Sequence, residues 1–163
     1  MGVAENKRSV TLKNVAEMIG IGAIVASLLF LAFEIQQSNR IAIASSEIGI
    51  RNGYSEFNRG IYTNPDTARL MSKARRADVV WSDTEELQVL MAVTDIYNVW
   101  LSVETACDNE LAEATTCGEL SDDIRAFVGY FPGVQGALRF NLDSYPSLED
   151  SEVHRTLREA LTN

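Results

Sequence analysis

The longest apolar run of the chain lies near its N-terminus and predicts a membrane-spanning helix. Sixteen consecutive residues, Met18 to Phe33, carry no charge. Extending the run to residues 15–35 gives 21 positions, with Glu17 and Glu34 near the ends, where carboxylates reach the membrane interface. Roughly 20 apolar residues in a helix cross the hydrocarbon core of a bilayer. We therefore predict a transmembrane helix over residues 15–35, after a basic tail over residues 1–14.

Two other interpretations of this run are a buried core helix and a cleaved signal peptide. A core helix seldom lacks a polar stripe over four turns. A signal peptide would use Lys7, Arg8 and Lys13 as its basic segment and Ala42-Ile43-Ala44 as its cleavage motif. Ten residues separate Phe33 from Ala44, which is longer and more polar than a cleavage region should be. We favour a retained anchor.

Small residues within the predicted span form a helix-association face. Gly22 and Ala26, like Ala23 and Ser27, lie four positions apart on neighbouring faces. Small residues at this spacing let two membrane helices approach closely. The alternative is that glycine and alanine are simply common in membrane spans.

The pattern beyond the span stays helical. Apolar residues recur at helical spacing along one face and predict a stalk over residues 36–61: Ile43, Ile50, Tyr54, Phe57 and Ile61. Asn64-Pro65-Asp66 is a helix start signal and predicts a helix over residues 65–76. Ser82 and Glu85 form a capping-box pattern that opens a long, mostly apolar helix reaching about Cys107.

The rest of the chain predicts shorter helices. A break is expected from Asp108 to Gly118, and Ser121 is expected to cap a helix that Pro132-Gly133 ends. A short helical piece then reaches about Asp143, and residues 145–147 form a turn. The last helix carries its apolar stripe at successive spacings of four: Val153, Leu157 and Leu161. The predicted fold is all-α, with one N-terminal transmembrane helix continuing into the stalk and an acidic domain of four or five short helices over residues 62–163.

Charge changes this picture by excluding one class of partner. The 163 residues carry 14 Lys and Arg against 23 Asp and Glu, a net charge of −9, so the chain is a poor match for nucleic-acid backbones. The charge is unevenly spread: residues 1–76 carry +4 and residues 77–163 carry −13. Any charge-driven partner of the C-terminal half should be cationic. Arg69, Lys73 and Arg76 share one helix face and could contact anionic lipid headgroups, or simply be solvated.

The orientation of the predicted span in the membrane is inferred from the basic residues around it and from the two cysteines. Three basic side chains precede the span and only Arg40 follows it closely, so the N-terminus is expected in the cytoplasm and the helical domain in the periplasm of a bacterial inner membrane. Cys107 and Cys117 bracket the break between two helices and could form a disulfide, which the periplasm permits. Two free thiols are the alternative.

Residue types suited to catalysis are sparse. Two cysteines and one histidine cannot complete a four-ligand zinc site of the Cys/His type, and no metal or cofactor is expected. His154 is expected at the surface or a boundary instead of acting as a base. The adjacent acids Asp122 and Asp123 are explained by the dipole at a helix start. Asp95 and Glu104 could form a buried carboxylate pair, but no E-x-x-H motif accompanies them. We predict no catalytic residues and no enzyme.

The segment IGAIVASLLFLAFEIQQSNR resembles the opening of a large group of bacterial single-pass membrane proteins of uncharacterised function. Their form is IGAI, an apolar run, S-L-x-Y-L-A and a polar I-x-Q ending. Three later segments also resemble that group in pattern and in order along the chain: Asn64-Pro65-Asp66, the helix around Tyr97-Asn98, and Phe131-Pro132-Gly133. The sequence differs from the group at two positions, with Phe30 in place of Tyr and Gln36 in place of Arg. The resemblance implies a bacterial membrane-anchored helical protein and no activity.

Three functions are consistent with these patterns. The first is a non-enzymatic accessory or scaffold subunit of a larger membrane assembly. The second is a self-assembling anchor whose stalk stripe joins copies of the chain. The third is a ligand-binding protein or enzyme with a pocket lined by Tyr97, Trp100 and Tyr130. We rank them in that order.

Overall fold

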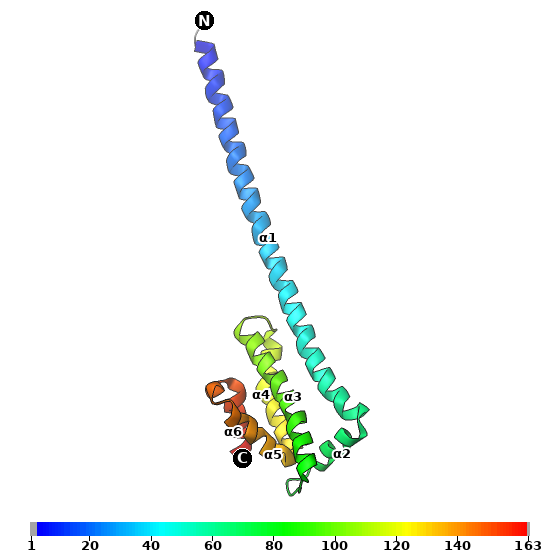
Figure 1. The fold of residues 1–163 in the computed structure, drawn as a ribbon. Coiled ribbons are helices and arrows are strands. Elements are labelled where there is room, and N and C mark those ends of the chain that lie inside the picture. The colour runs from blue at the N-terminus through cyan, green and yellow to red at the C-terminus, as the bar shows by residue number, and fades with distance from the viewer. Residues whose placement is uncertain (1–2, 163) are drawn as a thin grey trace. The chain divides into compact units, whose positions relative to one another are not determined.

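The computed structural model describes the backbone of residues 3–162 and the side chains of residues 14–162. Over that part of the chain every regular element is helical: six α-helices, two 3₁₀ turns and no strand (Figure 1). The predicted all-α fold with a long apolar N-terminal helix and a smaller helical region is confirmed. The Lys7, Arg8 and Lys13 side chains, on which the predicted orientation depends, lie outside the described residues.

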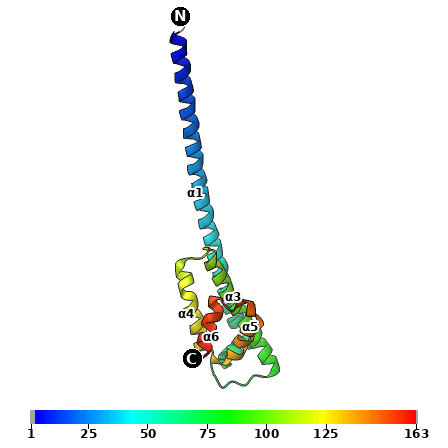
Figure 2. The same ribbon diagram turned by 90° about the vertical axis from the view of Figure 1, so that its left-hand side faces the viewer.

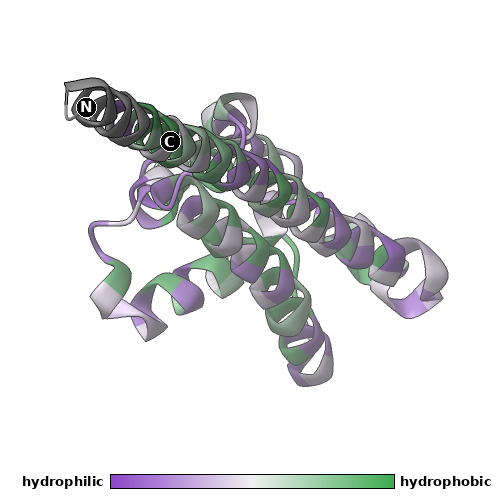
Figure 3. Ribbon diagram, turned by 90° about the horizontal axis from the view of Figure 1, so that it is seen from above, coloured by the Kyte–Doolittle hydropathy of each residue, from purple (hydrophilic) through white to green (hydrophobic). Residues whose placement is uncertain are grey.

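Helix α1 runs from Val3 to Thr63 and contributes to two compact units, residues 1–41 and residues 42–163. The helix begins inside the predicted tail and continues without interruption through the predicted span and stalk. It is the one helix, among the described residues, that is long and apolar enough to cross a membrane. Its apolar stretch is drawn green in Figure 3.

The second unit packs around α3 (Asp83–Asp108). Helices α4 (Ala114–Tyr130), α5 (Gln135–Ser144) and α6 (Glu152–Thr162) gather beside it in both side views (Figures 1 and 2). Tyr97 and Trp100 of α3 are fully buried at the centre of this bundle. The mostly apolar helix that the sequence predicts is therefore the central helix of this unit.

Two helix starts form as their local sequences predict. Asn64 caps α2 (Pro65–Lys73), and its side-chain oxygen accepts hydrogen bonds from the backbone N–H groups of Asp66 and Thr67. Ser82 and Glu85 form the complete capping box of α3. These contacts satisfy backbone donors that have no partner within a helix, so three or four residues suffice to specify them.

The predicted start of α4 is wrong. The helix begins at Ala114, so Ser121, Asp122 and Asp123 lie in its interior and the dipole at a helix start does not explain the two acids. The free N–H of Glu113 donates instead to Glu47 of α1 at 2.9 Å, and Thr116 Oγ1 donates to the same carboxylate at 3.1 Å. A carboxylate distant in sequence, instead of the predicted serine, therefore holds the residue that precedes the helix and the Thr116 hydroxyl group of its first turn.

The predicted stalk stripe faces the bundle of its own chain. Ile50 is 8% exposed and belongs to the core, and Tyr54 and Phe57 pack against it. The Phe57 and Phe127 rings lie edge to face, with centroids 6.1 Å apart. The compact second unit thus starts at Ala42, inside the residues predicted as a separate stalk.

Two 3₁₀ turns connect the C-terminal helices, η1 (Pro132–Val134) after α4 and η2 (Pro146–Leu148) after α5. Gly133 of η1 donates its N–H to Ala74 O at 2.8 Å. The carbonyl oxygen of Gly133 accepts a hydrogen bond from Trp81 Nε1 at 3.2 Å. The turn is therefore tied to the loop between α2 and α3.

Candidate functional site

The first candidate surface is the apolar stretch of α1. None of its large apolar side chains is covered within the first unit; each exposes between 49% and 73% of its surface. Monomeric proteins in water rarely expose a contiguous apolar patch of this extent. The patch is formed by Val15, Met18, Ile19, Ile21, Ile24, Val25, Leu28, Leu29, Phe30, Leu31, Phe33 and Ile35.

The predicted helix-association face lies within this patch. Gly22, Ala23, Ala26 and Ser27 are all exposed on α1. Ser27 Oγ donates to the carbonyl oxygen of Ala23 at 2.8 Å, so its hydroxyl group is satisfied inside the helix. The face therefore presents small side chains without an unpaired hydroxyl group, and association through it stays a prediction.

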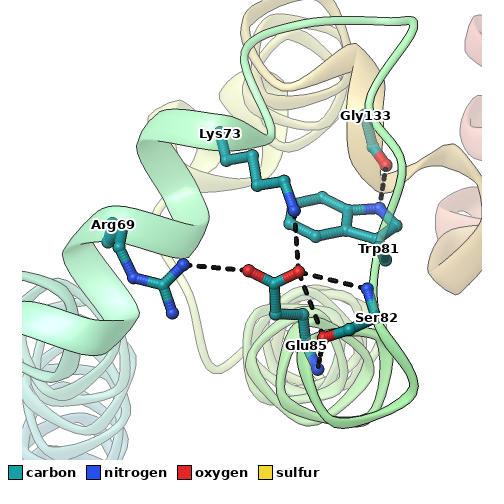
Figure 4. Close-up of polar contacts among 6 residues, drawn as sticks. All are labelled: Arg69, Lys73, Trp81, Ser82, Glu85 and Gly133. Carbon is teal, nitrogen blue, oxygen red and sulfur yellow. Dashed lines mark hydrogen bonds and ion pairs between the residues drawn. The ribbon is translucent and has the colours of Figure 1, made fainter.

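A polar cluster around Glu85 joins α2 to α3 (Figure 4). Arg69 Nη1 and Lys73 Nζ donate to the two oxygens of the Glu85 carboxylate at 2.9 and 2.7 Å. Lys73 Nζ also lies 4.9 Å from the centre of the Trp81 ring. These hydrogen bonds, led by the one from Lys73 and followed by those from Ser82 N and Arg69, lower the pKa of Glu85 to about 2. The cluster works as a clamp between two helices.

That clamp counts against the predicted headgroup contact. Arg69 and Lys73 both pair with the single carboxylate of Glu85 in the same chain, which offsets one of their two positive charges. The structure does not bring Arg76 into this cluster, and its side chain is exposed. Of the three basic residues predicted to share one face, Arg69 and Lys73 are thus paired with Glu85, and Arg76 is a separate surface charge.

Two further polar clusters hold the bundle together. Asp123 Oδ2 accepts hydrogen bonds from Tyr54 Oη and Trp100 Nε1, each at 2.9 Å, so it joins α1, α3 and α4. Burial, and then the charge of Asp123, raise the pKa of Tyr54 above its usual value. Glu104 accepts from the backbone N–H groups of Glu152 and Val153 and so caps α6. Both carboxylates have structural roles.

The prediction that His154 lies at the surface or a boundary is wrong. His154 has no exposed surface, and its Nε2 lies 2.5 Å from Tyr97 Oη. Burial, with a smaller contribution from the Arg158 charge, lowers the pKa of the imidazole; Glu104 and Glu149 act in the opposite direction. A neutral ring sealed in the core cannot reach a substrate, so its position favours a structural role.

The structure separates the other predicted groupings. Asp95 is exposed at a groove between α1 and α3, whereas Glu104 caps α6, so the two do not form a carboxylate pair. Tyr97 and Trp100 are fully buried and Tyr130 is exposed beside Arg75, so these aromatic residues do not line one open pocket. Among residues 14–162, no three His, Cys, Asp or Glu side chains are placed to hold a metal ion.

The two cysteines meet at the α3–α4 connection. The structure joins Cys107 and Cys117 in a disulfide, with their Cα atoms 5.7 Å apart. This separation lies within the range that a disulfide spans. The disulfide closes the same α3–α4 connection that Glu47 contacts. The start of α4 is therefore held both by the disulfide and by the hydrogen bonds to Glu47.

The second candidate surface is a groove of about 870 Å³ in the second unit, which we name the α1–α3 groove. Its walls come from α1 and α3, and α2 closes one end. Gly53, Phe57 and Gly60 of α1 line one wall; Leu87, Met91 and Asp95 of α3 line the other.

Three comparisons with known proteins place no relative beside this chain: no family model, no curated protein and no solved structure matches it.

Proposed function

We propose that this protein is a single-pass membrane-anchored helical domain that acts by binding other proteins, as a non-enzymatic accessory subunit of a membrane assembly. The observation that carries the proposal is the uncovered apolar patch over residues 15–35. Removing one large apolar side chain from water contributes about 1.5–3 kcal/mol, and the patch contains twelve. A lipid bilayer is the environment that covers all sides of such a helix at once.

The bundle supports a binding role. Its core is complete without the apolar stretch, since every core residue lies in the second unit. Its main polar clusters, around Glu85, Asp123 and Glu104, are engaged in joining or capping helices. The surface that the bundle leaves available for binding is acidic and contains the α1–α3 groove.

We further propose that the N-terminus lies in the cytoplasm and the bundle in the periplasm. The positively charged residues before the span support this orientation. So does the disulfide of Cys107 and Cys117, because disulfides persist in the periplasm and are rare in the cytosol. The resemblance to a bacterial membrane-protein group agrees with this placement.

The self-assembly alternative is weaker than the sequence suggests. Ile50 and Phe57, which would join two copies through the stalk, pack within the bundle of their own chain. We therefore favour the accessory-subunit function over self-assembly through the stalk.

Membrane extraction tests the anchor. In an Ile24→Asp/Leu28→Asp variant, each carboxylate near the centre of the span should cost about 2.5–3.5 kcal/mol of insertion free energy. We expect this variant to leave the membrane fraction in alkaline carbonate. The matched control is Ile41→Asp/Ile48→Asp, because these four side chains are 60–61% exposed but residues 41 and 48 lie outside the span. The control should stay in the pellet, and a wild-type protein that carbonate extracts would refute the anchor.

Two further measurements test orientation and assembly. Denatured, non-reduced protein from intact cells should take up a thiol reagent only after reduction; free thiols at both cysteines would count against the periplasmic placement. Gentle extraction in native detergent should give a complex larger than a monomer. A protein that runs alone as a monomer would reject the accessory-subunit function.

A further inference from the structure

We propose that the α1–α3 groove binds a basic amphipathic helix of a partner protein. The inference rests on the proposed binding function and adds to it the site and the chemistry of the partner. Four properties of the groove carry it: its length, its glycine-lined wall, its exposed apolar side chains and its acidic border.

The groove has the length of a short helix. It follows α3 from Leu87 to Val99, which at helical rise is roughly 18 Å. A second hollow of about 420 Å³ shares Gly53 and Val99 with it and extends the trough along α1 as far as Ser46. Because both walls are helices, an inserted helix packs its side chains between their ridges, with its own backbone hydrogen bonds already formed.

The α1 wall is open to close approach. Gly49, Gly53 and Gly60 recur at spacings of four and seven, so they lie along one side of the helix. Added Cβ atoms at Gly49 and Gly60 would meet nothing within 4 Å, whereas one at Gly53 would lie 3.1 Å from Val99. A glycine inside a helix destabilises it relative to alanine. Contacts within the chain explain that cost only at Gly53, so the space at the other two is free for a partner.

The opposite wall supplies apolar contacts. Leu87 and Met91 of α3 are 58% and 52% exposed although they lie on the central helix of the bundle. They are one turn apart on α3, so both can contact the apolar face of one inserted helix. Phe57 lies across from them on α1.

Charge identifies the partner. Three carboxylates line the groove, Glu56, Asp66 and Asp95, and no lysine or arginine is among its lining residues. A helix with Lys or Arg beside its apolar face would complement this border, whereas an acidic helix would be repelled. The groove therefore selects for a cationic helix.

A direct binding measurement tests the proposal. The full chain is placed in phosphatidylcholine nanodiscs and titrated against a labelled peptide of about 15 residues, long enough to fill the trough as a helix. The peptide carries leucine at helical spacing and lysine elsewhere; a second peptide carries glutamate in place of lysine. Fluorescence anisotropy gives Kd after subtraction of empty nanodiscs. We expect the lysine peptide to bind at least tenfold more tightly than the glutamate peptide.

Two pairs of variants locate the site. The groove variant Glu56→Gln/Asp66→Asn/Asp95→Asn should weaken lysine-peptide binding about tenfold, since each exposed charge pair contributes about 0.5 kcal/mol. The control Glu110→Gln/Asp78→Asn/Asp143→Asn changes net charge equally at exposed sites outside the groove and should change Kd less than threefold. Gly60→Leu fills the groove and should abolish binding. Gly129→Leu, equally unobstructed in α4, should not.

Several results would overturn the proposal. One is equal binding of the two peptides; another is equal weakening by the two triple variants, which would mean diffuse attraction to an acidic surface. Unchanged peptide binding by the Gly60→Leu variant would also overturn the proposal. A homodimer that dissociates in the Gly60→Leu variant would overturn it too, because a second copy of the chain would then occupy the groove. Failure here is distinguishable from failure of the proposed function: a wrong groove leaves carbonate resistance and the large native complex intact, also in Gly60→Leu.

Discussion

At Gly133 the backbone of η1 approaches the loop after α2 so closely that no side chain fits between them. A Cβ atom there would lie 2.6 Å from Val79 Cγ1, 2.7 Å from Arg76 O and 2.8 Å from Ala74 O. Two of these neighbours are backbone atoms, which cannot rotate away as a side chain can. Single positions of this kind, together with His154 and Glu85, decide how the short helices meet.

We predict that Gly133→Ala lowers the free energy of unfolding by about 1–3 kcal/mol, the usual cost of forcing extra volume into a packed site. Gly129→Ala is the control, because its Cβ atom meets nothing within 4 Å in helix α4. That variant should be neutral or up to about 1 kcal/mol more stable. Urea unfolding measures both, and equal stabilities would show that η1 moves freely.

His154 should make the bundle sensitive to mild acid. Because burial lowers its pKa below the ordinary 6.5, the unfolded chain takes up a proton as pH falls through that value while the folded chain does not. The free energy of unfolding should therefore be highest above pH 6.5 and fall below it, by at most about 1.4 kcal/mol per pH unit. Burial is the main cause of the lowered pKa; the charge of Arg158 adds to it, and the charges of Glu104 and Glu149 oppose it.

Urea unfolding of His154→Gln checks this prediction. The variant removes the titration, so its stability should change less than that of the wild type between pH about 7.5 and about 5.5. Tyr97→Phe removes the hydrogen bond but keeps the imidazole, and should lose stability while retaining the pH dependence. An unchanged slope in His154→Gln would assign the acid sensitivity to other groups.

At the scale of elements, four helices start where a side-chain oxygen accepts hydrogen bonds, and these acceptors lie either nearby in the sequence or on another helix. The caps of α2 and α3 are local. Those of α4 and α6 come from Glu47 and Glu104, on other helices. A long-range cap links the formation of one helix to the packing of another, so the short helices are expected to form together.

Glu47→Gln should loosen the start of α4. Glu47 is only 9% exposed, and its carboxylate accepts hydrogen bonds from Glu113 N and Thr116 Oγ1. Replacing the charged acceptor by an amide should cost about 1–2 kcal/mol. Hydrogen exchange at Glu113, whose N–H group Glu47 binds, and in the first turn of α4 should speed up while that of α3 stays unchanged. Glu56→Gln, on the same helix but exposed, should leave exchange unchanged; similar exchange in both variants would refute the role of Glu47.

At the scale of the whole molecule, the chain consists of two units, an apolar helix and an acidic helical bundle. The apolar stretch contributes no residue to the core, and the core belongs to residues 42–163. The N-terminal half of the chain is net positive and the C-terminal half carries −13. The two proposed interactions, with lipid and with a cationic helix, therefore use separate surfaces.

Residues 42–163 should fold without the rest. We expect this fragment in water to match the full chain in nanodiscs in free energy of unfolding to within about 0.5 kcal/mol, the usual effect of changes away from the core. A fragment starting at residue 52 also loses Glu47 and Ile50 and should be clearly less stable. A fragment 42–163 that fails to fold would show that the first unit stabilises the second.

The sequence alone determined the features that depend on neighbours along the chain. The apolar run predicts the long exposed helix, and Asn64 and Ser82 predict two helix starts, because hydropathy and capping act over a few residues.

The tertiary structure decided features that depend on contacts between helices. Glu47 fills the gap in the stripe between Ile43 and Ile50, and His154 lies three positions before Leu157 on the buried stripe of α6. Both positions were readable as core-facing, but their partners Glu113 and Tyr97 lie 66 and 57 residues away. Only packing brings such distant groups together, which is why the start of α4, the burial of His154 and the pairing of Arg69 and Lys73 with Glu85 appear only in the folded chain.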